Sequence, residues 1–210
     1  MKVAERYKLL IGGIVPRPIA FVSTISQKGE ENLAPFSFFT GVGSNPMTLL
    51  FCPANKDDGS EKDTLRNCKP HSEGGQGEFV VNVVSASFIR QAVAASEPIP
   101  YGTSEFRSVG LTPAPARIVR PPRVLESPIS FECRTLQIIR TNPGQPSGGN
   151  IVLGEVVHVH VRDGLANDRL HLDPALLDAV GRMGGLAYCR TRDRFELPMG
   201  MSALGQPAAT

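Results

Sequence analysis

The chain has 210 residues, of which 41% are hydrophobic and 20% charged, and its net charge is +2. This balance is typical of a soluble globular protein and excludes a disordered, fibrous or coiled-coil chain. A folded monomer of this size exposes roughly 9,500 Å² of the roughly 33,000 Å² of its unfolded chain, so a sizeable core is possible. No long run of either charge sign indicates a nucleic acid or an anionic membrane as a partner, and neither is expected.

The cysteines and the apolar segments indicate a cytoplasmic protein. Four widely spaced cysteines form no CxxC pair, which favours reduced thiols over a zinc site or a disulfide framework; they are Cys52, Cys68, Cys133 and Cys189. The longest apolar stretch, residues 9–22, is interrupted by Gly, Pro and Arg and is too short and broken to cross a bilayer. No convincing cleavage site follows it, which argues against a signal peptide.

Four segments in the first half of the chain are typical of strands. Ile19–Ser26 is rich in β-branched residues and is followed by Gln-Lys-Gly, which predicts a tight turn. Leu33–Thr40 and Met47–Cys52 are separated by the turn-like sequence GVGSNP, so these first three segments predict an antiparallel meander. Glu78–Ser85 consists almost entirely of β-formers and predicts a further strand.

Three short helices are predicted from their capping residues. A Ser with a carboxylate three residues later marks a helix start, Asp-Pro is a strong cap and first-turn pair, and Gly often ends a helix. The predicted helices are Glu61–Cys68 after Ser60, one capped by Ser87 that runs to Ala95, and one from Asp173 and Pro174 to Gly181.

The second half of the chain predicts an ordered excursion and a long hairpin. Residues 97–122 are rich in proline and poor in periodicity, so they are expected to form a surface excursion or lid. Ile129–Thr141 and Ile151–Asp163 are the longest strand patterns, and the loop NPGQPSGGN joins them. At least six strands without βαβ alternation predict a closed or split antiparallel barrel, one domain over 1–201, followed by a disordered tail at 202–210.

Residues 32–47 combine the side chains that hold a flat ring system. The segment contains aromatic residues, several hydroxyls and glycines near expected strand ends. A planar heterocycle needs an apolar or aromatic surface against its face and backbone N–H and C=O groups at its edge. The same residues could instead form only a strand, a glycine turn and another strand.

A second group brings hydroxyls and an ammonium to an expected helix N-terminus. It consists of Ser60, Lys62, Asp63 and Thr64. Unpaired N–H groups and the positive end of the helix dipole favour a phosphate at such a place. A plain capping box would use the same residues, but together with segment 32–47 the group could hold the phosphate of a ligand whose ring lies nearby.

Two histidines share one face of the second long strand. His158 and His160 lie two residues apart, so both could reach a ligand on that face. A metal would need a third ligand, which neither His71 nor His171 supplies by its position, and no metal site is assigned.

The segment 181–199 is basic and aromatic. Arg182 could neutralise a phosphate, and Tyr188 or Phe195 could cover a ring. These side chains could equally tie the segment to the body of the protein or to a second subunit. The chain contains neither GxGxxG nor a nucleophile elbow, which disfavours a Rossmann domain and a hydrolase.

At these residues the chain resembles the flavin reductase-like, FMN-binding split-barrel family, near flavoredoxin and the reductase components of two-component monooxygenases. The resemblance covers about 16–199, through PRPIAFVST, NLAPFSFFTGVGSNP, KDTLRN, GEFVVNVVS, ESPISFEC, GEVVHVHV, GRMGGLAYCRT and FELP. It implies a mainly β fold, an FMN-binding split β-barrel with a few short flanking helices. It also implies a homodimer with FMN held non-covalently near the interface.

The resemblance assigns a flavin site residue by residue. The residues that would line the isoalloxazine are Asn32, Ser37, Phe38, Phe39 and Thr40, with Ser44 and Asn45 beside them. Lys62 and Thr64 would hold the phosphate, and His160 and Phe195 would approach the flavin or a nicotinamide. Some relatives carry Trp in the first flavin segment, whereas this chain has none, so ring stacking would depend on Phe38 or Phe39.

The implied activity is an NAD(P)H-dependent flavin reductase that transfers hydride to FMN. Such transfer requires stacked rings and little acid–base help, so no catalytic residue is assigned. Reduced FMN would pass to a partner monooxygenase or be used in place. An FMN-binding electron-transfer protein without nicotinamide activity would share every motif, and a non-flavin barrel used for binding or assembly is a third interpretation. No feature distinguishes NADH from NADPH or identifies the final electron acceptor.

Overall fold

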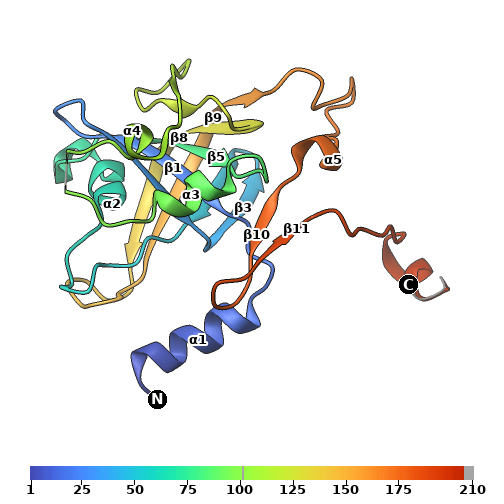
Figure 1. Cartoon of the computed structure of the whole chain (residues 1–210), viewed down its shortest axis with the longest axis horizontal. Coiled ribbons are helices and arrows are strands. Elements are labelled where there is room, and N and C mark those ends of the chain that lie inside the picture. Colours follow the sequence, from blue (N-terminus) through green and yellow to red (C-terminus); the bar gives the residue numbers. More distant parts are fainter. Residues whose placement is uncertain (101, 206–210) are drawn as a thin grey trace.

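A seven-stranded antiparallel sheet forms the body of the protein. In the computed structural model, which describes residues 1–100 and 102–205, the strand order is β2-β1-β5-β8-β9-β4-β3 (Figure 1). Its strands are β1 (Ala20–Ile25), β2 (Glu31–Phe36), β3 (Phe39–Ser44), β4 (Met47–Phe51), β5 (Glu78–Val83), β8 (Ile129–Arg140) and β9 (Asn150–Val161). Every neighbouring pair is antiparallel, which confirms the prediction of a mainly β chain without βαβ units.

Short ribbons and helices surround this sheet. The ribbons pair β6 (Pro113–Ala114) with β7 (Arg123–Val124) and β10 (Val180–Arg182) with β11 (Tyr188–Arg190). The helices are α1 (Val3–Gly13), α2 (Asp63–Cys68), α3 (Ile89–Ala94), α4 (Glu105–Val109), α5 (Pro174–Leu177) and the 3₁₀ helices η1 (His71–Glu73) and η2 (Gly200–Gly205). Within the described residues, no helix combines the length and apolarity needed to span a membrane.

The sheet separates two apolar clusters, so β1 is buried on both faces. Ala20 and Val22 contribute to one cluster, which α2 helps to close. Phe21, between them, contributes to the other, with Phe88 and side chains from α3 and α4. Successive side chains of a strand point to opposite faces, which is why consecutive positions 20–22 are all apolar.

The predicted three-strand meander is wrong. Leu33–Thr40 is not one strand, because β2 ends at Phe36 and β3 begins at Phe39. β2 pairs with β1, whereas β3 pairs with β4 and β4 with β9, so β2 and β3 lie at opposite edges of the sheet. The sequence GVGSNP is largely strand and not turn. The strand-like sequence pattern continues through the break between Phe36 and Phe39. Local sequence therefore does not show that the chain crosses from one sheet edge to the other there.

Two predicted caps are also wrong, although both helices form. α2 begins at Asp63 after Lys62, while the Ser60 hydroxyl donates to the Asp58 carboxylate at 2.6 Å. α3 begins at Ile89, and the Ser87 hydroxyl lies 2.7 Å from that of Ser85. In both places the hydroxyl that was expected to cap the helix forms a hydrogen bond with a neighbouring polar side chain instead.

The last predicted helix starts as expected and ends early. Asp173 caps α5, its carboxylate accepting from the backbone N–H groups of Ala175 at 2.7 Å and Leu176 at 3.2 Å. The helix ends at Leu177, where Asp178 takes a left-handed conformation with φ 41°. Gly181 therefore lies in β10 and does not terminate the helix.

The long hairpin and the ordered excursion are both observed. β8 and β9 pair along almost their whole length. The excursion over 97–122 contains α4 and β6. The buried carboxylate of Glu132 on β8 accepts from the backbone N–H groups of Arg117, Ile118 and Val119 at 2.6, 2.6 and 3.0 Å, which ties this segment to the sheet.

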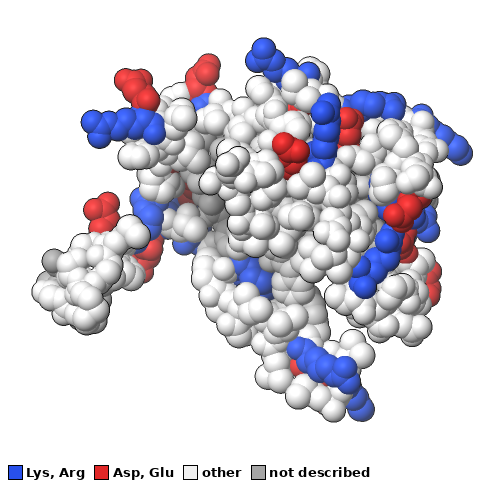
Figure 2. All heavy atoms as spheres, turned by 180° about the vertical axis from the view of Figure 1, so that it is seen from behind, with Lys and Arg blue, Asp and Glu red and all other residues white. Residues whose placement is uncertain are grey.

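α1 and the chain after β11 project from the body (Figure 1). Arg17, which is 3% exposed, joins α1 to the body through the carbonyls of Ile11, Ile14 and Met183. Both projections expose large apolar side chains, including Tyr7, Leu9, Leu10, Phe195, Leu197, Met199 and Met201. Figure 2 shows few charged side chains at the tip of the C-terminal arm.

The total accessible surface is 12341 Å². A compact monomer of this size exposes roughly 9,500 Å², so the chain exposes more surface than a compact monomer would. Of the predicted tail, 202–205 belong to η2, and 206–210 lie outside the described residues. All four cysteines are free thiols.

Gly154 on β9 leaves space for the ring of Phe79, since a Cβ at this position would overlap that ring. Gly154→Ala is expected to lower the free energy of unfolding by roughly 1–2 kcal/mol, because Phe79 is fully buried and cannot move without strain. Chemical denaturation measures this. Gly41→Ala on β3, where the added methyl meets no atom within 4 Å, is the matched control and should cost much less. Equal losses in the two variants would contradict the packing argument.

Candidate functional site

A cavity of about 200 Å³ lies between β2, the start of α2 and the segment after α3. Three residues assigned to the flavin site from sequence line it together: Asn32, Lys62 and Thr64. Its apolar side includes Ala34, Pro35 and Phe36, and the other polar residues that line it are Lys56, Asp63, Ser96, Glu97 and Glu105. Asn32 and Thr64 are distant in sequence and are brought together because α2 packs on β1 and β2.

A buried hydrogen-bond network fixes this wall. The Asn32 amide donates to the Thr24 hydroxyl at 3.0 Å and to the Thr64 hydroxyl at 2.9 Å. Asn67 of α2 also donates to Thr24, at 3.0 Å. Both amide hydrogens of Asn32 are used, so its carbonyl oxygen is the group left to accept from a ligand.

Lys62 is the cation of the cavity without an acidic partner. Asp63 pairs with Lys56 at 3.4 Å and with Arg66 at 3.6 Å, whereas no carboxylate of the described residues lies within ion-pair distance of Lys62. The pKa of Lys62 is lowered, first because the surrounding protein desolvates the ammonium and then because Lys56 lies near, and the smaller effect of the Asp57 carboxylate, which raises it, does not cancel these two. An anion at this place would relieve both effects, so these residues fit a phosphate group.

Glu105 adds a buried acid to the same cavity. Its carboxylate accepts from the backbone N–H of Leu33 at 2.8 Å, and burial raises its pKa. The bond fixes β2 at the point where Asn32 enters the cavity. Nothing in the sequence of α4 distinguishes Glu105 from a surface residue. Only the packing of α4 on β2 shows that this side chain lines the cavity.

A second cavity of about 350 Å³ continues from the first, since Pro35 and Ser96 line both. Ser37 lines it, and the Ser37 hydroxyl accepts from the Arg17 guanidinium at 3.2 Å. Across the cavity the Arg182 guanidinium stacks on the Tyr188 ring, 4.4 Å from its centroid. The two cavities form one groove along β2 with a cation at its start and an aromatic ring farther along.

The other assigned residues of segment 32–47 do not line this groove in the single chain. Phe38 lines another cavity, of about 910 Å³, with Leu10, Cys52 and Tyr7, of which Tyr7 also lines the second cavity. Phe39 lines a cavity of about 340 Å³ beside β4. Thr40, Ser44 and Asn45 are exposed on the β3–β4 hairpin, at the sheet edge opposite β2.

His160 and Phe195 also lie apart from the groove. The His160 Nε2 bonds to the carboxylate of the buried Glu132, and its ring contacts that of His158 edge-on at 4.7 Å between centroids. The two histidines share a face, as predicted. Phe195 lies on the C-terminal arm and is 68% exposed.

Glu132 is the third group near the two histidines, which sequence analysis did not identify. The potential ligand atoms of Glu132, His158 and His160 lie within 4.8 Å of one another. The carboxylate already accepts three backbone N–H bonds in addition to His160, so the cluster serves to hold the excursion. Burial alone would raise the pKa of Glu132, but these hydrogen bonds together lower it to about 2.

The family model described as a flavin reductase like domain matches residues 12–192. The chain belongs to the flavin reductase-like family. Its function is therefore a flavin-related one, and the groove along β2 is the place where the family's predicted phosphate-holding residues meet.

Solved structures of this family confirm the fold. Nitrilotriacetate monooxygenase component B from Bacillus cereus is 31% identical, with a TM-score of 0.86, and the match covers 94% of this chain and 95% of that one. A protein from Shewanella frigidimarina described as a flavin reductase with a split barrel domain is 22% identical (TM-score 0.77; 95% and 94% covered). The flavoredoxin of Desulfovibrio vulgaris is 21% identical (TM-score 0.71; 92% and 94%). The chain thus has the split-barrel fold of these neighbours, as expected from sequence.

Proposed function

We propose that this protein is an NAD(P)H-dependent flavin reductase that binds FMN non-covalently in the groove along β2. The observation that carries the proposal is Lys62, a desolvated cation without an acidic partner in a cavity that also presents Asn32 and Thr64. The groove continues past Ser37 to the Tyr188 ring, which leaves room for a ring system beyond a phosphate.

Each group in the groove has a separate role in this proposal. Lys62 and the Thr64 hydroxyl hold the phosphate, and the Asn32 carbonyl oxygen accepts from a hydroxyl or N–H of the ligand. Ser37, held by Arg17, lies at the ring end with Arg182 and Tyr188. When bound, FMN supplies a hydride-accepting ring that returns electrons to a second acceptor. The protein orients donor and acceptor and needs no general acid or base for that role.

A homodimer completes this proposal. α1 and the C-terminal arm expose many large apolar side chains, and a contiguous apolar surface of this kind marks a protein–protein contact. In a second copy these arms, and the hairpin carrying Thr40, Ser44 and Asn45, would come near a partner's groove. The name of the Bacillus cereus relative, a monooxygenase component, supports a partner oxygenase as the consumer of reduced flavin. The free cysteines agree with a cytoplasmic location.

A flavin-binding electron carrier is the second candidate, because the flavoredoxin of Desulfovibrio vulgaris shares the fold. The test loads the purified protein with FMN, removes unbound flavin and follows flavin absorbance anaerobically after adding NADH or NADPH. Rapid bleaching by either nucleotide is expected of the reductase. FMN that binds and stays oxidised with both would establish the carrier instead, and a protein that ignores FMN would refute both.

A further inference from the structure

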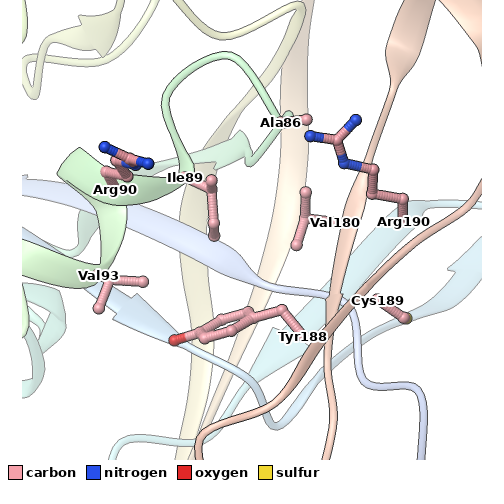
Figure 3. A pocket seen from close by; sticks show the side chains of 8 residues that line it. All are labelled: Ala86, Ile89, Arg90, Val93, Val180, Tyr188, Cys189 and Arg190. Carbon is pink, nitrogen blue, oxygen red and sulfur yellow. The ribbon is translucent and has the colours of Figure 1, made fainter.

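A third cavity, of about 450 Å³, extends the groove beyond the proposed flavin site (Figure 3). It shares Ile89, Val93 and Tyr188 with the second cavity, so the two are continuous. Its floor is largely apolar, formed by Ala86, Ile89, Val93 and Val180 together with the Tyr188 ring. An apolar floor beside an aromatic ring suits a flat organic base.

Two arginines border this cavity. Arg90 comes from α3 and Arg190 from β11, and Figure 3 shows Ile89 and Val180 between their guanidinium groups. Neither side chain forms an ion pair or hydrogen bond with any residue that the structure describes. Arg190 helps to lower the pKa of Asp178, but that carboxylate is already paired with Arg192 at 2.8 Å.

Two exposed guanidinium groups that form no ion pair with the described residues, both at one cavity, attract a group of more than one negative charge. Arg binds phosphate through paired N–H donors, which makes it suited to a phosphate monoester. Lys62 lies at the opposite end of the continuous groove, so this second cationic end is separate from the phosphate position already proposed for FMN.

We infer that this third cavity binds the adenosine 2′-phosphate of NADPH, so that the donor is NADPH in preference to NADH. The adenine lies on the aliphatic floor formed by Ala86, Ile89, Val93 and Val180, and Arg90 and Arg190 hold the 2′-phosphate, a group that NADH lacks. The nicotinamide half then extends along the groove toward Ser37, where the flavin ring is placed. This inference rests on the proposed function for the reaction, while the phosphate site itself is testable without it.

Binding is measured first, because it does not depend on turnover. Calorimetry compares adenosine 2′,5′-bisphosphate with adenosine 5′-monophosphate on the FMN-loaded full chain. The bisphosphate is expected to bind about tenfold more tightly, as one well-placed charged contact allows. Arg90→Gln and Arg190→Gln should each remove most of this preference, while Arg169→Gln, an exposed arginine outside the groove, keeps it.

Kinetics supply the second readout. In the wild type, kcat/KM for flavin reduction should be higher with NADPH than with NADH by about tenfold, and the two groove variants should lower the NADPH value alone. Equal binding of the two adenosine nucleotides, or a preference that survives both substitutions, overturns the inference. Binding of neither nucleotide, as expected if a second copy covers the cavity, also overturns it.

These results separate the inference from the proposed function. Equally efficient reduction by NADH and NADPH would support the proposed reductase activity and contradict the 2′-phosphate site. If the bisphosphate binds through the two arginines but neither nucleotide reduces the flavin, the phosphate site is supported and the reductase activity is contradicted.

Discussion

Lys62→Gln is expected to raise the Kd for FMN by roughly 30-fold, while leaving the Kd for riboflavin nearly unchanged. The ammonium lies in the cavity with Asn32 and Thr64, has no carboxylate partner among the described residues, and is desolvated by the protein. A charged hydrogen bond to a phosphate contributes about 2 kcal/mol, which corresponds to that change in Kd. Riboflavin lacks the phosphate, so it should not sense the substitution. Quenching of flavin fluorescence on titration measures both constants.

The control for this prediction is Lys28→Gln in the turn between β1 and β2, an exposed lysine that lines none of the described cavities. It should leave both constants unchanged. A parallel loss of FMN and riboflavin binding in the Lys62 variant would mean that the side chain supports the pocket and does not contact the phosphate. Unchanged FMN binding would place the phosphate elsewhere.

Glu132→Gln is expected to lower the free energy of unfolding at neutral pH by about 3 kcal/mol. The carboxylate is fully buried and accepts from the N–H groups of Arg117, Ile118 and Val119 as well as bonding to His160. An amide in its place turns one acceptor into a donor facing these groups, and an unsatisfied buried contact of this kind is costly. Urea denaturation measures the loss.

The same residue determines how stability changes in acid. The pKa of Glu132 is lowered from 4.5 to about 2 in the folded protein, so folding favours the ionised form. Its contribution is complete above pH 4.5 and is lost as the pH falls from 4.5 toward 2, because the unfolded chain takes up the proton first. The wild type should therefore lose about 3 kcal/mol more than the Gln variant across this window.

Glu155→Gln on β9 is the matched control for both measurements, since the Glu155 side chain makes no hydrogen bond or ion pair with the described residues. It should leave the neutral-pH stability and the acid slope close to those of the wild type. An acid slope in the Glu132 variant as steep as that of the wild type would show that other carboxylates govern acid unfolding.

Local patterns were sufficient for most individual elements. The β-branched runs that became β1 and β5 and the two long strands β8 and β9 were recognisable because side-chain alternation and turn residues act over a few neighbours. Asp173 was recognisable as a cap for the same reason. The predicted helix starts at Ser60 and Ser87 were wrong because each hydroxyl bonds to a polar side chain two residues away. The predicted helix end at Gly181 was wrong because that residue pairs in β10, which tertiary structure decides.

The candidate site shows the same division. The sequence by itself determined the family and the residue types that we propose meet a phosphate, because Asn32, Lys62 and Thr64 occur in the motifs that carry the family resemblance. Only the tertiary structure decided that these three share a cavity while Phe39 and Ser44 lie at the far sheet edge. It also revealed Glu105, Glu132 and the arginines Arg90 and Arg190. Strand pairing between distant segments is the physical reason, since it depends on long-range packing that neighbouring residues do not encode.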